Sequence, residues 1–180
     1  MRVITGTARG RRLNELKGKE TRPTTDRVKE GIFNIIQFDI EGRRVLDLYG
    51  GTGQLGIECL SRGAAHATFV DARTDAVKLI RENLAVTALA NRATVLTADY
   101  ATVLSGAVEK YDLVFLDPPY ETKLLERSLE LISQFDILRE HGIIICESPQ
   151  EKSLPDLSAP YGKYREYRYG KIKVTVYHRD

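Results

Sequence analysis

From residue 43 onward, short apolar runs alternate with segments that have the apolar spacing of helices. The apolar runs are "RVLDLYG", "ATFVDA", "ATVLTAD", "DLVFLD" and "GIIICES". Helical spacing follows each of the first four, in residues 54–63, 74–89, about 101–109 and about 121–138. Strands that recur between helices are typical of a parallel sheet covered on both faces. The pattern therefore predicts a doubly wound, Rossmann-like α/β fold.

The two ends of the chain depart from this alternation. The stretch "KYREYRYGKIKVTVYHR" (Lys163–Arg179) alternates polar and apolar residues around Gly170, which predicts a C-terminal antiparallel hairpin. The stretch "RVITGTARGRRLNEL" (Arg2–Leu16) predicts a second, smaller strand pair, with its turn near Arg9 and Gly10.

A helix is predicted between the small strand pair and the sheet, in "TRPTTDRVKEGIFNII". Thr24, Thr25 and Asp26 are its N-cap candidates, and apolar residues follow at helical spacing. Gly31 weakens this helix by roughly 1 kcal/mol relative to alanine, which indicates that another element packs closely there. We therefore expect an N-terminal extension over residues 1–40 and a main domain over residues 41–180, in one compact unit.

Composition is that of an ordinary globular protein: 180 residues, 42% hydrophobic and 29% charged. No apolar run approaches the roughly 20 residues that a membrane helix needs, and the N-terminus lacks a signal-peptide pattern. Cys59 and Cys146 each lie inside an apolar stretch, which favours buried free thiols over a disulfide. We expect a cytoplasmic protein.

Positive charge is concentrated at the N-terminus. Residues 1–29 carry nine basic and three acidic side chains, a net +6, so the other residues sum to −4 within the net +2 of the chain. Such an asymmetry is found both in polyanion-binding faces and in basic surfaces that only meet solvent.

Acidic residues recur at the ends of the first three predicted strands. Asp47 lies near the end of the first, before a glycine-rich turn, and Asp71 ends the second, 24 residues later. Asp99 directly follows the third. Ligands bind parallel sheets at these carboxyl ends, glycines let the backbone approach them, and an acid after the second strand can accept from ribose hydroxyls. Tight turns also need glycine for steric reasons, and Asp99 alone is equally well explained as a helix cap.

The glycine turn, "YGGTG", is not a dinucleotide fingerprint. Tyr49 stands where GxGxxG has its first glycine, and the chain has no GxxxxGK[ST] phosphate loop. A cofactor without phosphates therefore fits better. S-adenosylmethionine (SAM) would place its ribose at Asp71, its adenine amino group at Asp99 and its positively charged methionine moiety near Asp47.

The stretch "DPPY" ends the fourth strand at the same predicted edge. Methylation of an exocyclic base nitrogen needs acceptors that bind its N–H groups out of the ring plane. The Asp117 carboxylate and the Pro118 carbonyl can provide them, with Pro118 and Pro119 fixing the backbone. Tyr120 offers a ring on which an extruded base can stack. The alternative is that paired prolines simply terminate a strand.

"DPPY" resembles the [DN]PP[YF] motif of SAM-dependent amino-methyltransferases, and the whole chain resembles the RsmD family of bacterial 16S rRNA guanine-N2 methyltransferases. The matching stretches are "RVITGTARGRRL", "TRPTTDRVKEGIFNII", "VLDLYGGTGQLGIECLSRGA", "FVDA" and "DLVFLDPPY". Gly50 and Thr52 stand where we would expect a small alanine and a serine. The resemblance implies methylation of guanine 966 of that RNA, in an assembling 30S subunit.

The resemblance also assigns roles to residues. The cofactor contacts that it implies are Asp47, Gly51, Gly53 and Asp71, and we expect further contacts from Tyr49, Gly50, Ala72, Asp99, Tyr100, Arg22 and Thr24. The catalytic residues that it implies are Asp117, Pro118 and Tyr120, and we expect Pro119 to belong with them. The family directs its N-terminal extension toward ribosomal RNA, which implies phosphate contacts from Arg9, Arg11, Arg12 and Arg27. Arg22 and Arg27 have a second role open to them, ordering the segment over the cofactor.

Other functions compete with this one. The acid at position 117 suits the two parallel donors of a guanine edge, yet DPPY also occurs in adenine methyltransferases of DNA. Methyltransferases of cytosine or of glutamine side chains, and a non-catalytic nucleotide- or RNA-binding module, are further alternatives. A hydrolase or metal site is not expected, because there is no GxSxG elbow and His66, His141 and His178 have no triad or metal spacing.

Overall fold

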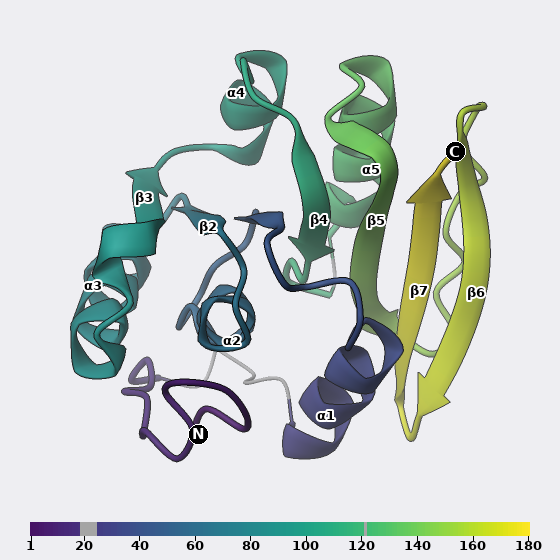
Figure 1. Cartoon of the computed structure of the whole chain (residues 1–180). Coiled ribbons are helices and arrows are strands. Elements are labelled where there is room, and N and C mark those ends of the chain that lie inside the picture. The colour runs from purple at the N-terminus through teal and green to yellow at the C-terminus, as the bar shows by residue number, and fades with distance from the viewer. Residues whose placement is uncertain (19–24, 121) are drawn as a thin grey trace.

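One seven-stranded sheet organises the protein in the computed structural model, which describes residues 1–18, 25–120 and 122–180 (Figure 1). The strand order is β3-β2-β1-β4-β5-β7-β6. The five strands β1 to β5 are parallel, and β7 pairs antiparallel with both β5 and β6. The predicted doubly wound fold with a C-terminal antiparallel hairpin is confirmed. The strands are β1 (Arg44–Asp47), β2 (His66–Asp71), β3 (Ala93–Thr97), β4 (Tyr111–Leu116), β5 (Leu138–Pro149), β6 (Tyr161–Tyr169) and β7 (Ile172–Arg179).

Helices cover both faces of the sheet, as Figure 1 shows. The core on one face is shared with α1, α2 and α3, and the core on the other face with α4 and α5. Because both faces are covered, β4 is buried at every position. The last two helices are shorter than the apolar pattern predicted. The helices are α1 (Asp26–Ile35), α2 (Gln54–Ser61), α3 (Thr74–Thr87), α4 (Tyr100–Ser105) and α5 (Leu124–Gln134), with a 3-10 turn, η1 (Ala90–Arg92).

The small strand pair predicted at the N-terminus is reduced to a short antiparallel contact, in which the amide of Val3 donates to the carbonyl of Arg11 and that of Leu13 to the carbonyl of Met1. Only one isolated antiparallel bridge forms within described residues 1–18, between Arg2 and Arg12. The backbone groups that would extend the ladder are taken by α2 instead. The amide groups of Ile4 and Thr5 donate to the Glu58 carboxylate, and the amide of Ala8 donates to Ser61 Oγ. The segment is therefore a loop held against a helix, which we call the N-terminal loop (residues 1–18).

Helix α1 begins where the sequence placed it, with Thr25 as its N-cap accepting from the amide of Val28. Thr24 lies outside the described residues. Gly31 makes the close contact that its place in the helix predicted, since a Cβ there would lie 2.5 Å from Tyr169 Cζ. Helix α1 thus packs directly on β6, although 125 residues lie between the two elements in the sequence.

The hairpin of β6 and β7 brings its turn to the carboxyl end of the parallel strands. Ile172, at the start of β7, pairs with Pro149, at the end of β5. The Tyr169–Ile172 turn therefore lies at the edge where β1, β2 and β4 also end, and Figure 1 shows this turn at the lower end of the hairpin.

Cys59 and Cys146 are buried free thiols, as predicted. None of the helices in the described ranges is long and apolar enough to cross a membrane.

Candidate active site at the carboxyl edge of the sheet

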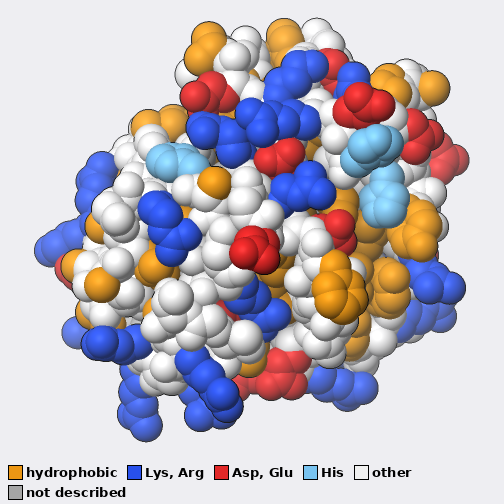
Figure 2. Space-filling model, in the orientation of Figure 1, with side chains coloured by type: hydrophobic (Ala, Val, Ile, Leu, Met, Phe, Trp, Pro, Cys, Tyr) orange, Lys and Arg blue, Asp and Glu red, His pale blue; other side chains and the backbone are white. Residues whose placement is uncertain are grey.

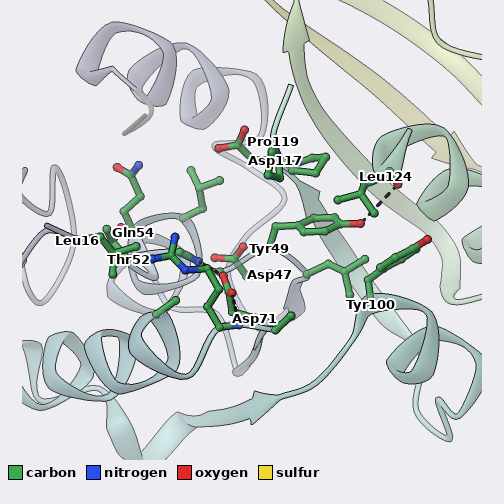
Figure 3. Close-up of a pocket in the computed structure, with 18 of the residues that line it drawn as sticks. Leu16, Asp47, Tyr49, Thr52, Gln54, Asp71, Tyr100, Asp117, Pro119 and Leu124 are labelled. Atoms are coloured by element: carbon green, nitrogen blue, oxygen red, sulfur yellow. Dashed lines mark hydrogen bonds between the residues drawn. The ribbon is translucent and has the colours of Figure 1, made fainter. Parts of the chain in front are cut away.

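A cavity of about 630 Å³ opens at the carboxyl ends of β1, β2 and β4. Figure 3 shows residues from these strand ends and from the N-terminal loop around it. The cavity brings together most of the residues that the sequence singled out. Those in its wall are Asp47, Tyr49, Gly50, Gly51, Asp71, Ala72, Asp99, Tyr100, Asp117, Pro118, Pro119 and Tyr120.

The glycine turn after β1 requires its glycines for steric reasons as well as for access. A Cβ on Gly50 would lie 2.8 Å from Ile80 Cδ1, and Gly51 and Gly53 have φ angles of +57° and +82°. Gly53 is not in the cavity wall but forms the left-handed N-cap of α2, packed on Ile57 and Ile80. Gly53 therefore has a structural role and its ligand contact stays a prediction, while Gly50 and Gly51 face the cavity.

Asp71, at the end of β2, ties the turn to the second strand. Its carboxylate accepts from the amide of Gly51 at 3.0 Å and from the amide of Arg73 at 2.9 Å. Each oxygen receives one of these bonds, so each keeps a further lone pair. The side chain is half-buried in the cavity wall. It is thus fixed in place and can still accept from two neighbouring hydroxyls.

Asp47 is a buried carboxylate, and few hydrogen bonds offset the cost of removing its charge from water. It is 2% exposed and accepts one hydrogen bond, from the amide of Gly56 at 3.2 Å. Burial, with a smaller contribution from the Asp71 charge, raises the pKa of Asp47 to about 7. A positively charged group in the cavity would favour the ionised form.

Asp99 caps a helix and also lies in the cavity wall, so its predicted contact with the cofactor stays a prediction. Its carboxylate caps α4 by accepting from the amides of Ala101 and Thr102, and the residue also lines the cavity. Beside it, the rings of Tyr49 and Tyr100 lie with centroids 6.0 Å apart. The Tyr49 hydroxyl lies 2.6 Å from Ser128 Oγ of α5, which fixes this aromatic wall. Figure 3 shows both rings on one side of Asp47 and Asp71.

The corner after β4 forms a further part of the wall. Asp117 and Tyr120 are half-buried and Pro118 is buried. The Tyr120 hydroxyl donates to Glu147 Oε1 at 2.8 Å, and Glu147, near the end of β5, is only 4% exposed. The sequence reasoning missed Glu147. Its signal was present in "GIIICES", where one more acid closes an apolar strand.

The wall contains further residues that the sequence did not predict. Met1, Glu15 and Leu16 come from the N-terminal loop, so this extension helps to close the cavity. Gln54, the first residue of α2, is 7% exposed, and its Oε1 finds no hydrogen-bond partner within the described ranges. The three loop residues reach the cavity only through tertiary packing, whereas Gln54 directly follows the glycine turn and was overlooked there.

The predicted RNA contacts lie outside this wall. Arg9, Arg11 and Arg12 are exposed on the N-terminal loop, and Arg27 is exposed at the start of α1. Arg9 also lines a separate cavity of about 190 Å³ between the loop and α1. Arg22, like Thr24, falls in the segment that the structure does not describe.

The charge of the wall suits a cationic ligand without phosphates. Its described residues include one arginine, Arg73, and six carboxylates: Glu15, Asp47, Asp71, Asp99, Asp117 and Glu147. Phosphates would be repelled by such a set, whereas a sulfonium and an ammonium group would be attracted. Together with the acceptors of Asp71 and the aromatic wall at Tyr49 and Tyr100, the residues fit SAM. No group of three potential metal ligands occurs in the part of the chain that the structure describes.

Comparisons with known proteins agree with this arrangement. The family model described as "Conserved hypothetical protein 95" matches residues 1–178. The chain is 41% identical to a Bacillus subtilis protein named as an rRNA methyltransferase, YlbH, over 98% of each protein. It is 34% identical to ribosomal RNA small subunit methyltransferase D of Escherichia coli, over 100% of this chain and 90% of that protein.

Solved structures give the same result. A structure from Escherichia coli, named as the methyltransferase yhhF, superposes with a TM-score of 0.90 at 33% identity, covering 100% of this chain and 98% of that one. A more distant structure of SMU.776, named as a methyltransferase complexed with SAH, superposes with a TM-score of 0.64. It is 18% identical, covers 84% of this chain and 48% of its own, and shows likeness of fold alone.

Proposed function

The chain belongs to the RsmD family of ribosomal RNA small subunit methyltransferases, and on that premise we propose that it methylates the exocyclic N2 of one guanine in 16S rRNA. The observation that carries the proposal is a shared cavity. The glycine turn after β1 and the Asp117–Tyr120 corner after β4 line the same 630 Å³ space. In this proposal, a methyl donor held at the glycine turn lies within reach of a base held at the Asp117–Tyr120 corner.

SAM, as the cofactor, supplies an electrophilic methyl group on a sulfonium sulfur. In this proposal Asp71 accepts from the ribose hydroxyls and Asp99 from the adenine amino group, while Asp47 faces the ammonium group of the methionine moiety. The acidic wall should bind SAM more tightly than the demethylated product, because the positive charge of the sulfonium is lost when the methyl group is transferred. That difference supports product release.

The chain's own contribution to the transfer is positioning. Asp117 and the Pro118 carbonyl accept from the guanine amino group and favour the pyramidal nitrogen that can attack a methyl carbon. Tyr120 stacks on the extruded base, a contact worth roughly 1–3 kcal/mol. The amino nitrogen becomes acidic once it is methylated, so Asp117 can receive its proton without being a strong base.

The RNA reaches the cavity over the basic N-terminal loop in this proposal. Arg9, Arg11 and Arg12 are exposed there and would contact phosphates, while Met1 and Leu16 of the same loop line the cavity. We further propose that the substrate is the rRNA within an assembling 30S subunit in the cytoplasm.

The decisive experiment is methyl transfer from radiolabelled SAM to small-subunit particles from a strain that lacks this protein. Mass mapping of the product should find one methyl group on a guanine N2. In parallel, Asp117→Ala should bind SAM normally and lose transfer. SAM binding by the wild type without transfer to any ribosomal RNA would instead support a non-catalytic RNA-binding module.

A further inference from the structure

A strip of aromatic and basic side chains runs along the edge strand β6, on the face of the sheet that α1 covers. Arg165, Tyr167 and Tyr169 alternate along the strand, and their β7 partners have side chains in the core of that face. Tyr167 and Tyr169 are half-buried against this core, and Arg165 is exposed, with its Cζ 5.7 Å from the centre of the Tyr167 ring.

A β-bulge adds one more ring to the strip. The register of β6 on β7 shifts between Lys163 and Arg165, so that Tyr164 is the extra residue. A bulge re-aims the side chain of its extra residue. Tyr164 is 60% exposed and stacks on His178 of β7, with ring centroids 4.3 Å apart and planes at 13°. Without the bulge, strand alternation would direct Tyr164 to the opposite face from Arg165.

The strip begins beside the active-site edge. Tyr169 contacts Gly31 of α1 and lies near Arg27, whose charge influences its hydroxyl. Tyr120 of the active site packs against the same core cluster as Tyr167 and Tyr169. The strip therefore starts at the carboxyl edge of the sheet, near α1, and extends away from it along β6. Figure 2 shows hydrophobic and histidine side chains gathered at the right of this face, where Figure 1 places β6 and β7.

The cations of the strip are available to a ligand. Arg27 and Arg165 are both exposed, and neither forms an ion pair with a carboxylate of residues 1–18, 25–120 or 122–180. Charged residues on an edge strand also prevent edge-to-edge association of sheets. That explanation accounts for the arginines but not for exposed, stacked rings beside them, which raise the risk of association.

We propose that this β6 strip, formed by Arg27, Tyr164, Arg165, Tyr167 and Tyr169, binds unpaired RNA nucleotides that flank the target base. This inference rests on the proposed function. Partly exposed rings with an exposed arginine among them, Arg165, and another at one end, Arg27, are features that bind single strands, because every base has a face that stacks and every linkage carries a phosphate. From Tyr164 to Tyr169 the strand spans roughly 17 Å, enough for several nucleotides. Paired bases would not expose their faces to these rings.

The test uses the full-length protein and fluorescein-labelled oligouridine of 12 nucleotides, with a 12-base-pair RNA duplex for comparison. Tyr164→Ala should weaken oligouridine binding roughly 5- to 150-fold, the range expected for one lost stacking contact. Tyr164→Phe keeps the ring and should match the wild type. Arg165→Ala should weaken binding and flatten its salt dependence. Arg127→Ala, at an exposed arginine of α5 on the other face, is the matched control and should change nothing.

Unchanged oligouridine affinity in Tyr164→Ala and Arg165→Ala would overturn the proposal. So would an equal loss of duplex binding in Tyr164→Ala, because the contact would then not depend on unstacked bases. Binding of a labelled polyglutamate peptide with the same dependence on Tyr164 would assign the strip to a protein partner instead. SAM affinity and melting temperature should stay unchanged in every variant. If the wild type fails to methylate RNA, the proposed function falls, while the oligouridine comparison still decides on the strip.

Discussion

Lys29 of α1 and Glu58 of α2 form an ion pair with both side chains wholly buried, Nζ and Oε1 being 3.7 Å apart. Lys29 also donates to the carbonyl of Arg2, and Glu58 accepts from the amides of Ile4 and Thr5. The pair thus holds the N-terminal loop against the helix that follows the glycine turn. The N-terminal loop, which carries the predicted RNA contacts, is therefore fixed to α2 by this buried ion pair.

Replacing Glu58 should destabilise the protein more than replacing Lys29. Glu58→Gln leaves the Lys29 ammonium buried without a carboxylate and should cost about 3–5 kcal/mol of unfolding free energy. Lys29→Met should cost less, because Glu58 keeps its amide donors and Arg62, whose Nε lies 3.8 Å away. Urea unfolding at pH 7 measures both. The exposed Arg127–Glu130 pair is the control, and Glu130→Gln should change stability by less than about 1 kcal/mol. Equal costs for the two core variants would contradict this account.

Asp47 should make the ligand-free protein less stable as pH rises. Its pKa of about 7 in the folded state exceeds the roughly 3.9 of an unfolded aspartate. The folded state therefore holds a proton that the unfolded state loses, and stability declines from about pH 4 to about pH 7. Asp47→Asn should remove this loss and stabilise the protein by up to about 4 kcal/mol at pH 8, with little effect at pH 4. Urea unfolding of both proteins across this range tests the sign, and a stability difference that does not vary with pH would contradict it.

The same carboxylate predicts how cofactor binding depends on pH. If Asp47 faces the ammonium group, binding requires its ionised form, so affinity should fall by up to about tenfold per pH unit below pH 7. Calorimetric titration with S-adenosylhomocysteine, the demethylated cofactor product, between pH 5.5 and 8.5 measures this. Asp47→Asn should bind weakly at every pH and flatten the profile. A wild-type profile as flat as that of the variant would place the ammonium group elsewhere.

Tyr120 and Glu147, joined by a hydrogen bond, should affect methyl transfer together rather than independently. Tyr120→Phe keeps the stacking ring but removes the donor, and Glu147→Leu removes the acceptor. Each should lower kcat on small-subunit particles with little change in SAM affinity, and the double variant should be no worse than either single one. Glu147→Gln keeps an acceptor and should largely retain activity. Losses that simply add in the double variant would show that the hydroxyl does not work through Glu147.

Charge reversal at the N-terminal loop should separate RNA binding from cofactor binding. Arg11 and Arg12 are exposed and lie outside the cavity wall. Replacing both with glutamate should weaken 16S rRNA binding strongly and reduce its dependence on salt, while S-adenosylhomocysteine affinity stays unchanged. Filter binding at several salt concentrations measures the first, and calorimetry the second. Arg127→Glu on α5 is the control. Unaltered RNA affinity would mean that the arginines of this loop are solvent-exposed and do not contact RNA.

The sequence by itself determined the sheet and the acids at its edge. Apolar runs between helical segments fix which residues are buried on both faces, and in a parallel sheet the ends of such runs meet at one edge. Asp47, Asp71 and Asp117 could therefore be brought together from spacing alone. The cap role of Asp99 is likewise local, since a helix N-terminus needs an acceptor within three residues.

Tertiary structure decided the contacts between segments far apart in the chain. Glu58 takes the amide of Ile4, 54 residues away, so the predicted strand pair became a loop. Glu147 reaches Tyr120 because β5 lies beside β4, and Gly31 admits Tyr169 because the last hairpin folds back against α1. Periodicity records whether a side chain is buried, but not which buried polar group it meets. That pairing is set by the crossing of distant elements, where each buried donor and acceptor must find a partner.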